Sequence, residues 1–223
     1  MSLKLAIWDM DGTLVDSREI IHESMMQGFK ACGLTPPTYD QSRRIVGLSL
    51  HEACARLAPE DVAPETIDAL VAGYRQAFIA FRSRPGYVQP LYDGAMEILE
   101  QLRDENWLIA MATGKTRQGI RSVFASHPME PFFDTIWCAD DGPGKPHPFM
   151  VQQSMDALGV EAHQSLMIGD ATFDILMGNA AGVKTLGVSW GFGTSDELAE
   201  AGADEIHETF ESLSASLSSF TLN

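Results

Sequence analysis

The sequence predicts an α/β fold, a Rossmann-like doubly wound parallel sheet, with an all-helical cap domain inserted after the first strand. Two observations lead to this prediction. Short apolar segments bounded by Gly, Asp or Pro alternate with segments of helical periodicity, as strands and crossover helices do. One long stretch, residues 16–87, has helical patterns but no convincing strand. We therefore expect an α/β core of residues 1–15 and 88–223 and a cap domain of residues 16–87.

The predicted strands are short apolar runs. Strands covered by helices on both faces of a parallel sheet are apolar throughout rather than alternating. Runs of this kind occupy residues 3–8, 108–112, 135–138, 165–168 and 183–188.

The predicted core helices repeat apolar residues at helical spacing. Met96, Leu99 and Leu102 share one face of residues 94–103. Further helices are expected at residues 116–126, 147–158 and 172–181. The serine-rich tail also predicts a packed helix, because one helical face carries Phe210, Leu213, Leu217 and Phe220.

The inserted stretch carries helical patterns at residues 20–31 and 67–81. Turn residues follow these patterns at Arg84-Pro85-Gly86, where we expect a hinge between cap and core.

Composition excludes several classes of function. The chain of 223 residues is 45% hydrophobic and 21% charged, with a net charge of −16. Such an acidic chain repels nucleic acid and anionic membranes, so neither is expected as a partner. Three distant cysteines without a Cys-x-x-Cys pair argue against disulfides and structural zinc, and we expect a cytoplasmic protein. No sequence feature indicates an oligomeric state.

Chemically active residues follow the predicted strands. In open α/β sheets, ligands bind beyond the carboxyl ends of the strands. The residues expected to meet at this edge, from four separate segments, are Asp9, Asp11, Thr113, Gly114, Lys145, Asp170 and Asp174.

These residue types are those of a phosphoryl-transfer site. Clustered aspartates raise one another's pKa unless a cation compensates them, and oxygen ligands favour Mg²⁺. Lys145 adds positive charge, and backbone N–H groups near Gly12 and Gly114 can hold phosphate oxygens. An aspartate such as Asp9 can act as a nucleophile, and Asp11 is close enough to exchange a proton with the leaving oxygen or with water.

At these positions the chain resembles the haloacid dehalogenase superfamily, on its phosphatase side, with a helical cap of the first type. The first motif spans Asp9-Met10-Asp11-Gly12-Thr13-Leu14-Val15-Asp16-Ser17. Thr113 fits the second motif, Lys145 the third, and Asp170 with Asp174 the fourth. Ala-Thr-Gly-Lys at 112–115 and Trp-Gly-Phe-Gly at 190–193 resemble the phosphoglycolate phosphatase-like branch.

The resemblance implies a role for each matching residue. Asp9 is expected to be the nucleophile and Asp11 the general acid and base. Thr113, Gly114 and Lys145 are expected to bind the phosphoryl group. The implied magnesium ligands are Asp9, the carbonyl of Asp11 and Asp170, with Asp174 supporting the metal.

Several residues keep an alternative interpretation. Asp174 is either a first-turn acid favoured by the helix dipole or a group with a direct metal role. Lys115 either reaches the phosphate or is a solvated surface lysine. Three arginines of the cap either bind the far end of the substrate or lie on a solvated helix face: Arg43, Arg44 and Arg56. Two histidines of the cap, His22 and His51, could face the site.

The leading functional hypothesis is a Mg²⁺-dependent phosphatase that hydrolyses a small phosphorylated metabolite through an aspartyl-phosphate. A sugar phosphomutase resembling β-phosphoglucomutase would use the same core residues. Dehalogenation is disfavoured because that branch does not use the second acid, here Asp11. A non-catalytic binding module would not need Asp9, Asp11, Lys145 and Asp170 together.

Overall fold

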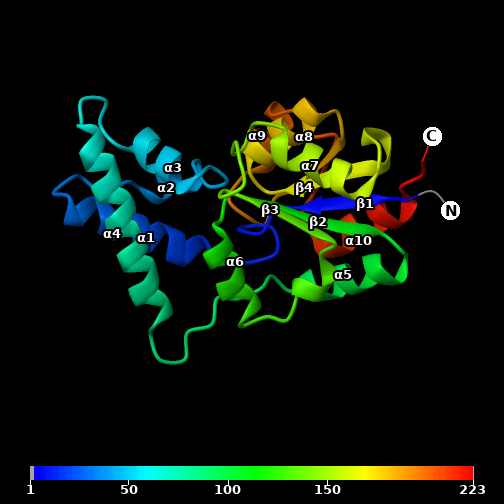
Figure 1. Ribbon diagram of the computed structural model, residues 1–223, viewed down its shortest axis with the longest axis horizontal. Helices are drawn as coiled ribbons and strands as arrows, with labels where there is room; N and C mark the ends of the chain where they lie inside the picture. Colours follow the sequence, from blue (N-terminus) through cyan, green and yellow to red (C-terminus); the bar gives the residue numbers. More distant parts are fainter. Residues whose placement is uncertain (1–2, 223) are drawn as a thin grey trace.

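The centre of the protein is a parallel sheet. The computed structural model describes residues 3–222, and these residues form six strands in the order β3-β2-β1-β4-β5-β6 (Figure 1). The strands are β1 (Leu5–Trp8), β2 (Leu108–Thr113), β3 (Thr135–Cys138), β4 (Ser165–Gly169), β5 (Lys184–Val188) and β6 (Glu205–His207). The predicted doubly wound α/β class is confirmed.

The strand register aligns the carboxyl ends of the central strands. Trp8, the last residue of β1, pairs with Met111 of β2 and Ile168 of β4. The chain segments that leave these three strands therefore start side by side at one edge of the sheet.

Helices cover both faces of the sheet. Successive residues of a strand point to opposite faces. Trp8 accordingly packs in one apolar cluster with Leu99 and Leu213, while Ile7 packs in another with Met150 and Met177. The flanking helices are α5 (Ala95–Asp104), α6 (Arg117–Phe124), α7 (Phe149–Leu158), α8 (Thr172–Ala181), α9 (Ser195–Glu200) and α10 (Phe210–Ser219), with 3₁₀ turns at Glu130–Phe132 and Ala162–Gln164.

Four inserted helices lie between β1 and α5, at the carboxyl edge of the sheet (Figure 1). They are α1 (Arg18–Ala31), α2 (Tyr39–Arg43), α3 (Leu50–Leu57) and α4 (Pro64–Arg82). Residues 16–87, all of which the structure describes, contain no strand. The inserted helices bury a separate apolar cluster in which Ile20, Phe29 and Leu70 are almost fully enclosed.

The structure adds short elements that periodicity does not predict. Strand β6 has three residues, two of them polar, and helices α2 and α9 have five and six residues. These segments are too short to repeat an apolar face. His207 is buried at the end of β6.

Glu197 of α9 links the inserted segment to the core through ion pairs with Arg43 and Arg44. Arg43 of α2 contacts the Glu197 carboxylate of α9 at 2.7 and 3.0 Å and donates to the Phe192 carbonyl at 3.1 Å. Hydrogen bonding to Arg43, with help from the Thr194 N–H, lowers the pKa of Glu197 from 4.5 to about 2.

The Arg43–Glu197 pair should stabilise the protein in a pH-dependent way. A carboxyl with a depressed pKa stabilises the fold above its unfolded value and loses that contribution as the pH falls through its folded value. We expect Glu197→Gln to lower the free energy of unfolding by about 1–2 kcal/mol at pH 7, since the pair is charged but partly exposed. Urea unfolding of both proteins should show this difference shrinking as the pH falls from 4.5 towards 2. A difference independent of pH would contradict the assignment.

Candidate active site

The site is built at the carboxyl edge of the sheet, where β1, β2 and β4 end. Asp9 directly follows β1, Thr113 is the last residue of β2, and Asp170 directly follows β4. The Asp9 N–H donates to the Ile168 carbonyl at 2.9 Å, which continues the pairing of β1 with β4 past the last strand residue. All three side chains are almost fully buried, so their positions are fixed by the sheet.

Lys145 holds two of the acids together. Its Nζ lies 2.6 Å from Asp9 Oδ1 and 2.6 Å from Asp174 Oδ1, and all three side chains are buried. Asp174 is in the first turn of α8, where its other oxygen accepts the Ala171 N–H at 3.0 Å. Asp174 therefore has both a helix-capping role and direct contact with the site lysine.

Asp170 is anchored by neighbours on two sides. Its Oδ1 accepts the Thr13 hydroxyl at 2.8 Å, and its Oδ2 accepts the Phe192 N–H at 2.7 Å. Gly12 passes so close that a Cβ there would lie 2.2 Å from Asp170 Oδ2, and its φ of +91° also favours glycine. The backbone of the Asp-x-Asp-Gly turn therefore packs directly against Asp170.

Three carboxylates converge in this site. One oxygen from each of Asp9, Asp170 and Asp174 lies within 4.8 Å of the others. Burial, which the attraction of Lys145 does not offset, raises the pKa of Asp9 from 3.8 to about 7. Burial and the neighbouring Asp174 and Asp9 likewise raise the pKa of Asp170.

The converging acids fit a hard divalent cation. Burial lowers the pKa of Lys145. The negative charges of Asp174 and Asp9 have a larger effect in the opposite direction, so the pKa of the lysine is raised. One ammonium among three carboxylates nevertheless leaves net negative charge in a buried space. Buried oxygen donors with such a deficit are the donor set that Mg²⁺ and similar cations prefer.

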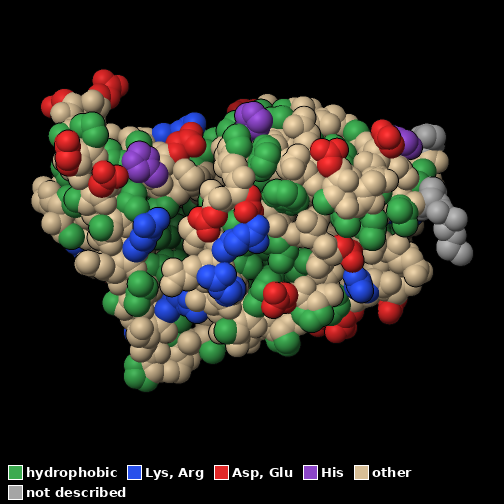
Figure 2. Space-filling model, in the orientation of Figure 1, with side chains coloured by type: hydrophobic (Ala, Val, Ile, Leu, Met, Phe, Trp, Pro, Cys, Tyr) green, Lys and Arg blue, Asp and Glu red, His purple; other side chains and the backbone are tan. Residues whose placement is uncertain are grey.

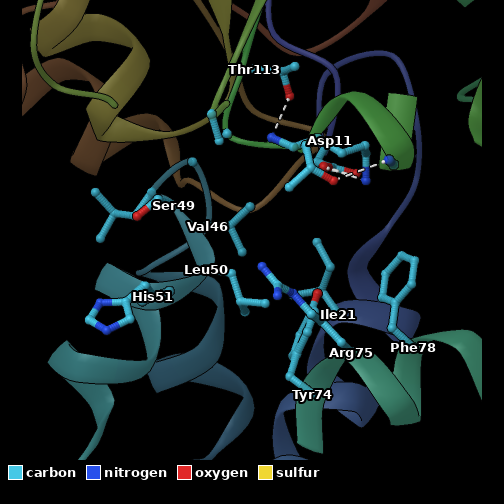
Figure 3. A pocket seen from close by; sticks show the side chains of 18 of the residues that line it. Asp11, Ile21, Val46, Ser49, Leu50, His51, Tyr74, Arg75, Phe78 and Thr113 are labelled. Atoms are coloured by element: carbon cyan, nitrogen blue, oxygen red, sulfur yellow. Dashed lines mark hydrogen bonds and ion pairs between the residues drawn. The ribbon is translucent and has the colours of Figure 1, made fainter. Parts of the chain in front are cut away.

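Asp11 lies apart from this cluster. Its carboxylate pairs with Lys115 Nζ at 2.8 Å, and the Lys115 N–H in turn donates to Thr113 Oγ1 at 3.2 Å (Figure 3). The carboxylate of Asp11 is therefore not one of the three converging acids, which leaves its backbone carbonyl as the ligand that the resemblance implies. Lys115 is not a solvated surface residue, because it is enclosed beside Asp11.

A cavity of about 390 Å³ opens between the strand ends and the inserted helices (Figure 3). Asp9, Asp11 and Thr113 line its sheet side. Gly114 also lines it, and a Cβ at this position would lie 2.7 Å from the Gly47 carbonyl oxygen. The inserted loop therefore rests directly on the second motif. The wall from the inserted helices is mainly apolar and includes Ile21, Met25, Val46, Leu50, Tyr74 and Phe78.

The three arginines singled out in the inserted segment are not in this cavity. Arg43 pairs with Glu197, Arg44 lies 3.2 Å from Asp40, and Arg56 pairs with Glu52 at 2.8 Å. His51 does line the cavity, whereas His22 lies 3.0 Å from the Ser42 hydroxyl.

Two other arginines line the cavity instead. Arg75 and Arg82 both lie on α4, seven residues apart. Their spacing in the sequence could have indicated this position. Arg75 and Arg82 lie on one helical face with Tyr74 and Phe78, because positions three, four and seven residues apart share a face.

Comparison with known proteins places these features in a family. Residues 6–188 match the haloacid dehalogenase-like hydrolase family. The chain is 33% identical to the "Probable phosphatase IndB" of Dickeya dadantii (92% of this chain, 90% of the relative). It is 30% identical to the "Pyrophosphatase PpaX" of Halalkalibacterium halodurans (92% and 93%). A solved hydrolase from Pseudomonas syringae superimposes with a TM-score of 0.85 at 25% identity, covering 98% of each chain. With the family match extending from β1 to β5, the chain belongs to the haloacid dehalogenase-like hydrolases.

Proposed function

We propose that the protein is a Mg²⁺-dependent phosphatase that hydrolyses a small phosphomonoester through an aspartyl-phosphate on Asp9. The observation that carries this proposal is the position of the Asp9 carboxylate, held by Lys145 at 2.6 Å on the floor of a cavity. The names of the relatives from Dickeya dadantii and Halalkalibacterium halodurans, a phosphatase and a pyrophosphatase, support phosphate-ester chemistry.

The reaction follows from the carboxylates and their partners. A carboxylate oxygen of Asp9 attacks phosphorus, and the bond from phosphorus to the ester oxygen breaks. Asp11 gives a proton to the leaving oxygen, then takes one from the water that attacks the phospho-enzyme and frees Asp9. Lys145, Thr113 Oγ1 and the Gly114 N–H would bind the phosphoryl oxygens, whose charge grows in the transition state.

The magnesium ion would be held by Asp9, the carbonyl of Asp11 and Asp170, with Asp174 as a supporting acid. When bound, the ion supplies positive charge that offsets the repulsion between phosphate and the carboxylates. Thr13 and the Phe192 N–H keep Asp170 oriented through its two oxygens. These hydrogen bonds would fix the direction in which the Asp170 carboxylate faces the metal ion.

Residues 16–87 would form the cap domain over a core of residues 1–15 and 88–223. The separate apolar cluster of the inserted helices supports this division. Their loop against Gly114 and their apolar wall over Asp9 would exclude bulk water during attack on phosphorus. The family match and the phosphatase-named relative support a small phosphorylated metabolite as the substrate. Within residues 3–222, no helix has both the length and the apolar character needed to cross a membrane.

Removal of divalent metal should abolish activity. We expect purified protein to release inorganic phosphate from p-nitrophenyl phosphate with Mg²⁺ and to lose this activity after chelation with EDTA, because the buried acids then repel the phosphate. Added Mg²⁺ should restore it, and circular dichroism should show that chelation leaves the fold intact. Full turnover in metal-free buffer would exclude the proposed site chemistry.

Product analysis separates hydrolysis from phosphomutase chemistry. The mainly apolar wall of the cavity favours hydrolysis, because the hydroxyls of a bound sugar would need polar partners there. With a hexose 1-phosphate, we expect free phosphate if any reaction occurs. Formation of the hexose 6-phosphate would identify a mutase, and a substrate panel that includes phosphoglycolate and pyrophosphate would then define the preferred ester.

A further inference from the structure

Arg75 is a cation without a partner at the cavity. It lies on the face of α4 that also presents Tyr74 and Phe78 to the cavity (Figure 3). Within the described part of the chain, no carboxylate pairs with Arg75 and no carbonyl accepts its guanidinium. Its side chain is exposed, so a ligand can reach it without displacing protein groups.

The other strong cations of the cavity are engaged. Lys115 pairs with Asp11 at 2.8 Å, and Arg82 donates to the Ser122 carbonyl at 3.1 Å. This contrast matters in a chain of net charge −16, where carboxylates are abundant partners. Figure 2 shows Lys and Arg side chains, with Asp and Glu side chains among them, where the inserted helices meet the core. An anionic ligand would find Arg75 available, whereas Lys115 and Arg82 are already occupied by protein groups.

Arg75 and Asp9 line the same cavity as several apolar side chains. Ile21, Leu50 and Phe78 line the same cavity between the inserted helices and the ends of the strands. A ligand that fills this space would place its phosphoryl group at Asp9 and an apolar body against these side chains. Its far end would reach the guanidinium of Arg75.

We propose that Arg75 is a specificity-determining residue that binds a second anionic group of the substrate, separated from the phosphomonoester by an apolar spacer. This inference rests on the proposed phosphatase function and narrows its substrate class. The spacer is longer than the single methylene of phosphoglycolate, because so short a molecule would leave most of a 390 Å³ cavity unfilled. The second anion is a carboxylate or a phosphate, since a guanidinium binds either through paired hydrogen bonds.

A series of synthetic substrates tests this proposal. It consists of straight-chain alkyl phosphates of increasing length that end in a carboxylate, each matched with its uncharged methyl ester. The ratio of kcat/KM for the acid to that for the ester measures recognition of the second charge alone. We expect this ratio in the wild type to exceed about tenfold at the best length, as for hydrogen bonds to charged partners.

Three variants assign the effect to Arg75. Arg75→Gln should reduce the acid-to-ester ratio to about one, and Arg75→Lys should restore part of it by returning the charge. Arg121→Gln is the matched control, because Arg121 is an exposed arginine on α6 outside the cavity lining, and it should keep the wild-type ratio. Glutamine is a good helix former, so the exposed site on α4 should tolerate it.

The outcomes separate this inference from the proposed function. The role of Arg75 would be overturned by an acid-to-ester ratio near one in the wild type, or by a ratio that Arg75→Gln leaves unchanged. In either case, hydrolysis of the methyl esters would still support the phosphatase function. Failure to release phosphate from any member of the series or from p-nitrophenyl phosphate would overturn both. A parallel series ending in a second phosphate shows by its larger or smaller ratio which anion the site prefers.

Discussion

Replacing Asp9 by asparagine is expected to abolish turnover without unfolding the protein. The amide keeps the size of the carboxyl but cannot act as an anionic nucleophile, so kcat should fall by roughly 10⁴-fold or more. Asp9 is a buried carboxylate whose pKa is raised mainly by burial, so the neutral amide removes a charge that is costly to bury. Phosphate release with Mg²⁺ and thermal unfolding, measured on the same sample, check both parts.

The matched control for this experiment is Asp156→Asn. Asp156 is an exposed aspartate in the last turn of α7, outside the cavity lining, and its loss should leave kcat within about twofold, as for surface changes generally. Substantial turnover by Asp9→Asn would show that another group attacks phosphorus. A phosphorylated form of the wild type, trapped by rapid acid quench and missing from Asp9→Asn, would identify the attacking residue directly.

Replacing Lys145 by methionine is expected to cause the largest loss of stability. Lys145 is fully buried between Asp9 and Asp174, each 2.6 Å from its Nζ. Without the ammonium, two buried carboxylates face each other uncompensated, and the free energy of unfolding should fall by about 3–5 kcal/mol. Urea unfolding in the presence of EDTA measures this loss without compensation from a bound metal.

A partly exposed lysine, Lys184, provides the control that tests whether the expected loss of stability in Lys145→Met depends on burial. Lys184 pairs with Glu205 at the same distance of 2.6 Å, but its side chain is 38% exposed. Lys184→Met should therefore cost less than about 1 kcal/mol. The double variant Lys145→Met with Asp174→Asn should regain part of the loss, because one carboxylate is gone. Equal costs for the two lysine variants would show that the buried charges do not govern stability at the site.

The fold could be predicted where the chain is locally regular. Strands β1, β2 and β4 are buried apolar runs, because helices cover both faces of the sheet. Strand β6 was missed since an edge strand of three residues has no such run. Helix α9 was missed too, although Thr194 and Glu197 form a capping box that a search for start signals would have found.

The candidate site could be predicted only in part. Asp9, Thr113 and Asp170 were found because each stands where a predicted strand ends, and the structure brings them to one edge. The engagement of Arg43 by Glu197 was not foreseen, since these residues lie 154 positions apart and no local pattern joins them. For the same reason, nothing local distinguished the unpartnered Arg75 from the paired arginines.

The sequence by itself determined which residues follow strands, which acids stand two positions apart, and which family they resemble. Those properties depend on periodicity and spacing, which act over a few residues. Only the tertiary structure decided that Arg43 meets Glu197, 154 positions away, and that α4 presents Arg75 to the cavity above Asp9. Such contacts depend on how strands register and how helices pack, and therefore on the sum of many small interactions across the whole chain.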